Sequence, residues 1–337
     1  MTNHPTIYNL TPKKVKSQGD AIPLAQQLKA LFDTIPEDGL LKALKGYYAG
    51  RKGYTHKILW RTYLAMTILN LPSFAALIRT LVNNPYVAQV CGIDSAEGIP
   101  SKFAYSRFIR KLQEPGNVVL VKNIMRTLTR RCCEALPNFG KSVAIDATDM
   151  KAWSNGSKKN KSDPDAGWVI KGDTNGKRKF VWGYKMHLMV DTTHEIPITV
   201  NITKGNTSDV RKASGLLRDT RRILKFHPDY VICDAGYSSE ELRRLIKRQY
   251  RAEAIIKAHK HHKRWIVDET PEWQLIFNRR TAVERVFGRM KNHRRLNNIT
   301  VRHLRKVTVH SLIPVIVTQA MALAFPDRPR NCVSWEF

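Results

Sequence analysis

The sequence is short of cysteine and of acidic residues, and each shortage excludes a class of protein. Its 337 residues include five cysteines, an odd number with no C-x-x-C pair. That count argues against a disulfide framework and against a zinc site. Asp and Glu together number 28 against 57 Lys and Arg, so the net charge is +29. This excess predicts a polyanionic partner, because each phosphate contact releases condensed counterions. A basic surface kept for solubility is the alternative.

The sequence also lacks a signal peptide and a long apolar run. Its first residues, MTNHPTIYNLTPKK, contain no apolar core of the kind that a secretory signal needs. The most apolar late stretch, residues 312–325, is too short to cross a bilayer and contains Pro314, Thr318 and Gln319. We therefore expect this stretch to form a core helix. Together with the unpaired cysteines, these features predict a cytoplasmic protein that does not contact a membrane.

Helical spacing over the first 136 residues predicts an all-α region. Leu24, Leu28 and Leu31 recur at helical intervals, and Ser73 precedes a helical segment as an N-cap would. The turn-forming residues at 137–140 then mark a boundary. The length predicts two domains. The predicted divisions are a mobile basic arm at 1–20, a helical domain at 21–136, a second domain at 141–325 with a C-terminal helix, and a tail at 326–337.

Short apolar runs after residue 140 predict an α/β domain. Residues 151–178 are expected to form a polar loop. Strands are predicted at 142–147, 180–190, 196–202, 230–233 and 252–256, and helices at 209–224, 239–249 and 280–292. Three neighbouring strands followed by alternating helices predict a mixed sheet with helices on both faces.

Two aspartates end buried apolar runs of this predicted sheet. Asp146 follows Val-Ala-Ile, and Asp234 follows Tyr-Val-Ile-Cys. Ligands of open α/β sheets bind outside the carboxyl ends of the strands. Two acids on adjacent strands would repel unless a cation lies between them, and Mg²⁺ prefers oxygen ligands. Either acid alone is better interpreted as a turn or helix cap. The pair favours a metal site. Asp149 is a rival for the first position, but it lies three residues along the strand and therefore on the opposite face.

A third acid lies in a basic helical segment. Residues 279–306 hold ten Lys or Arg and one acid, Glu284. On a helix, Arg280, Glu284 and Lys291 fall within about 40° of one another and share a face. Glu284 is either a salt-bridge partner of its neighbours or a metal ligand whose neighbours bind DNA phosphates. The same choice arises for the histidine-rich stretch at 259–262, which fits no common zinc spacing and is better interpreted as a DNA-contacting loop.

These residues carry a family resemblance. The spacing of Phe277, Arg280, Glu284 and Lys291 resembles the Y-x2-R-x3-E-x6-K signature of bacterial and archaeal insertion-sequence transposases with a DDE catalytic core. Phe277 replaces the usual tyrosine, which removes a hydroxyl donor but keeps an aromatic face. The resemblance covers residues 141–292 and extends through AIDATDM, FVWGYKMHLMVDTTHEIPITVNITKGNTSDV and VICDAGYSS. The block IPSKFAYSRFIRKL is similar to the helical N-terminal region of these transposases.

The resemblance implies a ribonuclease H-like catalytic domain after an all-α domain that binds DNA or dimerises. It implies a DNA transposase that cleaves and joins strands at the ends of its own insertion sequence. Asp146, Asp234 and Glu284 would be the catalytic metal ligands for two Mg²⁺ ions about 4 Å apart, with Mn²⁺ able to substitute. The expected DNA-contacting residues are Phe277, Arg280, Lys291, Arg294, Arg295, Lys185 and Trp265.

The implied partners are the element ends and target DNA, bound as double strands by a homodimer in the nucleoid of a bacterium or archaeon. We further expect residues 1–136 to read the element ends and the stripe at 279–306 to supply salt-sensitive affinity. The alternative is that the helical region mainly dimerises. Two other functions stay open: a structure-selective nuclease or resolvase of the same fold, and a domesticated DNA-binding protein that has lost catalysis.

Overall fold

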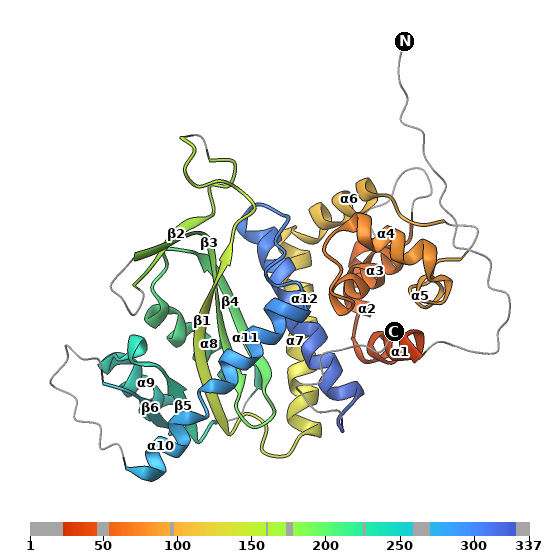
Figure 1. Cartoon of the computed structure of the whole chain (residues 1–337). Coiled ribbons are helices and arrows are strands. Elements are labelled where there is room, and N and C mark those ends of the chain that lie inside the picture. Colours follow the sequence, from red (N-terminus) through yellow and green to blue (C-terminus); the bar gives the residue numbers. More distant parts are fainter. Residues whose placement is uncertain are drawn as a thin grey trace.

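A computed structural model describes residues 23–45, 54–94, 98–159, 161–172, 178–224, 227–258 and 270–327. Figure 1 shows helices α1–α6 on one side, a sheet on the other, and the two long helices α7 and α12 between them. His259–His262 and Trp265, which we expected to contact DNA, lie outside the described residues.

The first half of the chain is helical, as predicted. The helices are α1 (Pro23–Thr34), α2 (Asp38–Lys45), α3 (His56–Ile68), α4 (Phe74–Asn83), α5 (Pro85–Val90), α6 (Lys102–Leu112) and α7 (Pro115–Ala135). Three of them begin at a hydroxyl side chain that accepts a hydrogen bond from a backbone N–H in the first turn. These caps are Thr55, Ser73 and Ser101. The cap predicted at Ser73 is confirmed by its 3.2 Å bond from the Ala76 N–H.

The second half forms one mixed sheet. Its strands are β1 (Ser142–Lys151), β2 (Gly167–Gly172), β3 (Arg178–Asp191), β4 (Ile196–Lys204), β5 (Tyr230–Cys233) and β6 (Glu253–Ile256). The order is β2-β3-β1-β5-β6, with β4 also paired to β3. β3 is antiparallel to β1, β2 and β4, whereas β1, β5 and β6 run parallel. The predicted mixed α/β sheet is confirmed.

Helices cover both faces of this sheet. They are α8 (Asp209–Leu224), α9 (Glu240–Tyr250), α10 (Pro271–Asn278), α11 (Thr281–His293) and α12 (Leu304–Ala324). α8 and α9 pack on the face that carries Val143 and Ile145 of β1. α11 and α12 belong to the cluster on the opposite face, which includes Ala144 and Leu188. Neighbouring residues of a strand point to opposite faces, so each position on β1 selects one of these two environments.

One predicted boundary is wrong. The loop expected at 151–178 contains β2, in which the buried Val169 alternates with the exposed Trp168 and Ile170, and β2 pairs with the first half of β3. The helix α11 does not extend back to Phe277. Phe277 lies in α10, and a turn at residues 279 and 280 separates α10 from α11.

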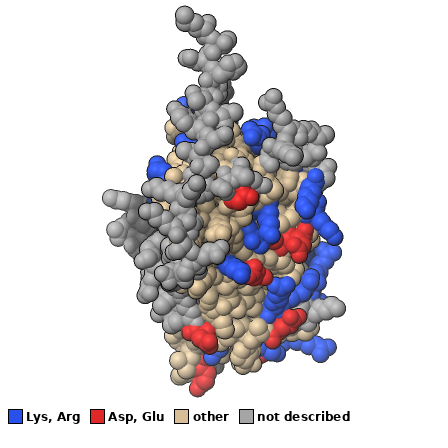
Figure 2. Space-filling view, turned by 90° about the vertical axis from the view of Figure 1, so that its right-hand side faces the viewer, with Lys and Arg blue, Asp and Glu red and all other residues tan. Residues whose placement is uncertain are grey.

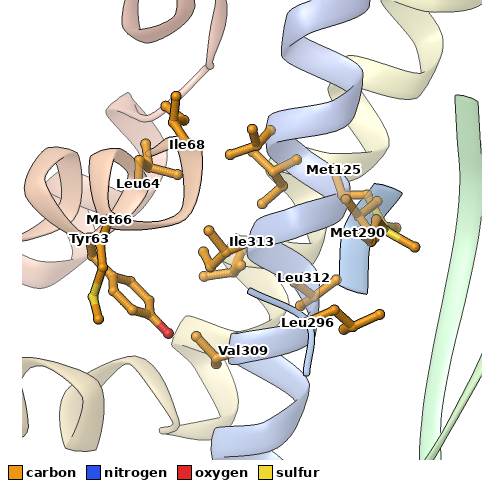
Figure 3. Close-up of a cluster of buried hydrophobic side chains, with 14 of the residues drawn as sticks. Tyr63, Leu64, Met66, Ile68, Met125, Met290, Leu296, Val309, Leu312 and Ile313 are labelled. Carbon is orange, nitrogen blue, oxygen red and sulfur yellow. The ribbon is translucent and has the colours of Figure 1, made fainter. Parts of the chain in front are cut away.

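The helix α12 joins the two halves of the molecule. The apolar stretch predicted to be a core helix is one, and it extends to 21 residues. It is long and apolar enough to cross a membrane by length and composition, but 72% of its most apolar window is buried inside the protein. Figure 3 shows Ile313 facing Leu64 of α3 while Leu312 lies near Met290 of α11. One buried cluster therefore runs from α1 through α12 to the sheet.

This shared core predicts cooperative unfolding. Replacing Leu312, which is fully buried, by Ala should lower the free energy of unfolding by about 2–5 kcal/mol. Urea denaturation followed by circular dichroism and by tryptophan fluorescence should give one coincident transition. Leu275→Ala is the control, because Leu275 is 67% exposed and should change stability by less than about 0.5 kcal/mol. Two separate transitions in Leu312→Ala would show that the halves unfold independently.

A buried histidine of α12 predicts acid sensitivity. The His310 Nε2 donates to the Arg295 carbonyl oxygen at 3.1 Å, and burial, aided by the Arg295 charge, lowers the pKa of His310 to about 3. The unfolded chain then binds this proton more tightly than the folded chain, so stability falls as pH drops below the ordinary histidine pKa of 6.5. Between pH 7 and pH 5 the loss should be on the order of 2 kcal/mol. His310→Gln should flatten this pH dependence in denaturant titrations, and an unchanged slope would contradict a neutral buried imidazole.

Candidate active site

The register of two parallel strands brings Asp146 and Asp234 side by side. Ile145 of β1 pairs with Cys233 of β5, and each aspartate is the next residue along its chain. Asp146 lies opposite Leu188, so its side chain is on the sheet face that α11 covers. Asp234 begins a short 3-10 turn, Ala235–Tyr237. One detail differs from the sequence expectation: Asp146 lies within β1, which continues to Lys151.

The helix α11 adds the third acid. Glu284 lies in its first turn, and the opposite side of the helix packs on the core through Val283, Val286 and Met290. The guanidinium of Arg280 lies 2.7 Å from Glu284 Oε1 and 3.8 Å from Asp146 Oδ2. Arg280 therefore links the acid of the helix to the acid of the strand. The three acids predicted from separate segments surround one place in the fold.

The charges of Asp146, Asp234 and Glu284 favour a cation between them. Burial raises the pKa of Asp146 to about 6, with Asp234 and Glu284 adding to the rise, although the Ala147 N–H and Arg280 oppose it. The Asp234 Oδ1 is buried and has no hydrogen-bond partner. Carboxylates that repel one another while one oxygen is unsatisfied fit a divalent ion with oxygen ligands. Among the described residues, no three acid, histidine or cysteine side chains stand in metal-ligand geometry, and Arg280 already contacts two of the acids.

Two stacked aromatic rings lie next to Arg280. Phe277 stacks on Trp273 with ring centroids 5.1 Å apart and planes 8° from parallel. The Lys257 ammonium lies 4.9 Å from the Phe277 ring centre, and the Arg280 guanidinium lies 5.9 Å from it. A cation contacts the face of an aromatic ring, so these contacts need no hydroxyl. Phenylalanine can therefore make them at the position where the signature has Tyr, and Phe277 is placed to orient Arg280.

Lys185 lies on the other face of the sheet. Its ammonium contacts both carboxylate oxygens of Asp209, at 2.9 and 3.1 Å, and the Thr207 carbonyl oxygen at 3.2 Å. Asp209 is the first residue of α8, where a negative charge interacts favourably with the helix dipole. Lys185 therefore forms an ion pair on the face of the sheet opposite Asp146, and its predicted DNA contact stays a prediction. His187 joins this cluster, with its Nδ1 3.6 Å from Asp209 Oδ1; the sequence offered only strand alternation as a signal for it.

Arg294 and Arg295 were predicted to bind DNA, a prediction that stays untested, and both side chains are buried. Their exposed fractions are 6% and 2%. The chain turns back after α11, with Arg295 at a positive φ of 60°. The Arg295 N–H donates to Asn70 Oδ1 at 3.2 Å, and Asn70 Nδ2 donates to the Asn292 carbonyl oxygen at 2.8 Å. Asn70 thereby ties the end of α3 to the end of α11, a role that no sequence pattern signalled.

Other members of the predicted basic stripe are also engaged. Arg285 and Arg289 both contact Glu195, each at 2.6 Å. Lys291 is partly exposed near the end of α11. The basic stripe at 279–306 therefore makes structural contacts and also forms a charged surface. Its residues Lys291 and Arg280 are more accessible to a phosphate than the buried Arg294 and Arg295.

Comparison with known proteins gives related sequences. A family model described as "Transposase DDE domain" matches residues 137–318, and one described as "Transposase domain (DUF772)" matches residues 16–111. A curated protein of Brucella ovis, described as a transposase for insertion sequence element IS6501, is 30% identical over 112 residues. The match spans 33% of this chain and 78% of that protein.

Two solved structures are more distantly similar. A piggyBac transposase synaptic complex with hairpin DNA is 12% identical, with a TM-score of 0.47, over 91% of this chain and 75% of that one. A Mos1 transposase paired-end complex with the left transposon end is 12% identical, with a TM-score of 0.23, over 82% of this chain and 81% of that one. The family relationship rests on the two family models and not on these structural similarities.

The position of Arg280 predicts competition with metal ions. Arg280→Gln should tighten Mn²⁺ binding by the DNA-free protein about 3- to 10-fold, or ~0.7–1.4 kcal/mol, because a cation would leave the carboxylates. Isothermal titration calorimetry measures this affinity. Arg285→Gln is the matched control, since Arg285 lies on the same helix but contacts Glu195. Equal or weaker Mn²⁺ binding by Arg280→Gln would show that the guanidinium does not compete with the ion.

Proposed function

Because the chain belongs to the family of transposases with a DDE domain, we propose that Asp146, Asp234 and Glu284 are its catalytic carboxylates. The chain is a DNA transposase, a metal-dependent DNA-cleaving enzyme. The proposal extends this to cleavage at the ends of its own insertion sequence and joining of those ends to target DNA. The observation that carries the site is Arg280, whose guanidinium contacts Asp146 and Glu284 beside the strand pair that aligns Asp234.

The three carboxylates would hold divalent ions, which we propose to be two Mg²⁺ replaceable by Mn²⁺. Bound there, the ions would activate water or a DNA 3′-hydroxyl and stabilise the leaving oxygen. The protein's own part is positioning. β1 and β5 fix two acids through backbone pairing, and α11 fixes the third through its buried side. Arg280, oriented by Phe277, and Lys291 would hold the DNA backbone, since phosphoryl transfer depends on position and charge more than on a covalent protein nucleophile.

We also propose how DNA is held. The helical region, which matches a transposase domain model over residues 16–111, would contribute to end recognition or to pairing of two protomers on DNA. The face in Figure 2 carries Lys and Arg next to Asp and Glu, which suits specific contacts better than a uniform electrostatic surface. We propose that the protein acts in a bacterial or archaeal cytoplasm and associates with the nucleoid.

The test of the site separates catalysis from binding. Asp146→Ala, Asp234→Ala and Glu284→Ala should each lower strand cleavage at least about 10³-fold, which is ~4 kcal/mol of barrier. DNA affinity in metal-free buffer should stay the same or rise, since each substitution removes repulsion of phosphates. The assay incubates the purified protein with Mg²⁺ and DNA carrying paired element ends. Cleaved and joined products are resolved on gels.

The matched control is Asp149→Ala, three residues further along β1 and in register with Lys185 on the other face. It should keep cleavage within a few-fold of wild type. Near-normal cleavage by any of the three Ala variants would remove that residue from the site. Cleavage without joined products would identify a nuclease or resolvase, and DNA binding without cleavage would identify a binding protein.

A further inference from the structure

A two-stranded ribbon, β2 with the first half of β3, presents apolar side chains to solvent. Ile170 is 59% exposed and Phe180 is 57% exposed, and the two are cross-strand partners. Trp168, the next residue on the same side of β2, is 37% exposed. Large apolar groups that are adjacent and exposed mark an interaction surface more often than scattered ones do. We call Trp168, Ile170 and Phe180 the ribbon face.

The ribbon face is held rigidly at its base. Trp182, the partner of Trp168, is buried, and its ring centre lies 5.4 Å from that of Trp168. Its Nε1 donates to Ser154 Oγ at 3.0 Å, and the Lys161 ammonium lies 4.7 Å from the ring centre. A Cβ at Gly156 would come within 2.4 Å of the same ring, so only glycine allows the chain to pass there. The exposed rings thus project from a fixed platform.

The ribbon face lies on the same side of the sheet as the catalytic aspartates. Along β3, Phe180, Tyr184 and Leu188 have the same alternation, and Leu188 is the register partner of Asp146. The eight residue-to-residue steps from Phe180 to Leu188 span at most about 26 Å at 3.3 Å per step. That length equals about seven or eight base steps of DNA at 3.4 Å each. Figure 1 shows the ribbon extending from the sheet on the side away from α1–α6.

The chemistry around the ribbon face suits nucleic acid. Lys161, Arg178 and Lys179 are exposed at or beside the ribbon, where they can contact phosphates. An apolar surface with cations at its border can bind a DNA strand whose bases are unstacked. The bases stack on the apolar side chains, and the anionic backbone contacts the cations. Fully paired duplex offers no such faces except at its end.

We propose that the ribbon face binds unpaired bases of a DNA strand beside the cleavage site, about seven or eight nucleotides from the scissile phosphate. The inference rests on the proposed function, since it assumes that DNA lies across Asp146 and Asp234. The occupant is single-stranded DNA flanking the duplex. The outer edge of β2 at the end of the sheet offers a second copy of the chain as the rival occupant.

The test compares two DNA probes in metal-free buffer. One is a blunt duplex, and the other is the same duplex with a single-stranded thymidine tail of about eight nucleotides, the length of the ribbon's reach. Wild type should bind the tailed probe more tightly in fluorescence anisotropy. Phe180→Ser and Trp168→Ser should lose about 5- to 100-fold of affinity for the tailed probe and keep that for the blunt one. Phe180→Tyr should retain the preference, and Val119→Ser, on α7 and 50% exposed, is the control.

Each outcome bears on one claim. A wild type that binds both probes equally, or ribbon variants that keep the tail preference, would overturn the proposal. Ribbon variants that change a dimer into a monomer in light scattering would assign the face to a second copy instead. Failure of the proposed function is distinct from both, because it would appear as absent cleavage in Mg²⁺ whatever the tail preference in metal-free buffer.

Discussion

The burial of α12 is the interaction on which the rest of the structure depends. This helix packs against α7 and β4 on one side and reaches α1, α3 and α6 on the other, so its side chains belong to both halves of the molecule. α11 joins the same cluster through Met290 and Val286, and α11 carries Glu284. The position of an acid at the sheet therefore depends on hydrophobic contacts made by a helix that contains none of the catalytic residues. A basic chain with this much self-repulsion needs such a core to stay compact.

The acids are held against their own repulsion. Backbone pairing of β1 with β5 fixes Asp146 beside Asp234, and burial makes the charge of Asp146 costly. Arg280 offsets part of that cost, while Phe277 and Trp273 keep its guanidinium in place. The same residues are thus suited to two partners in turn, the carboxylates and an incoming phosphate. The carboxylates of such a site repel one another until a cation binds between them. Repulsion of this kind is usual in functional carboxylate clusters.

Local patterns predicted most of the fold and the three acids. The runs before Asp146 and Asp234 are apolar because their strands are buried, and the resemblance to the transposase signature singled out Glu284 among the basic residues of 279–306. What local patterns could not predict depends on contacts between distant segments. Arg294 and Arg295 look like surface cations, yet both are buried, and the Arg295 N–H donates to Asn70, more than two hundred residues earlier. The ion pair of Lys185 was not predicted because its partner, Asp209, comes from another element. β2 was missed because its partner strand and its exposed apolar face give a mixed pattern.

The register of β1 with β5 also limits how this sequence can change. Ile145 and Cys233 are paired, and each acid follows by one position. Substitutions in these strands alter packing, but a single inserted or deleted residue before Asp146 would turn its carboxylate to the face of α8 and α9. Insertions and deletions are therefore excluded from the four or five residues of β1 and β5 that precede the acids. The chain between β1 and β3 does not have to keep a fixed length. Related chains should differ in length at the ribbon and keep the spacing from Ser142 to Asp146 invariant.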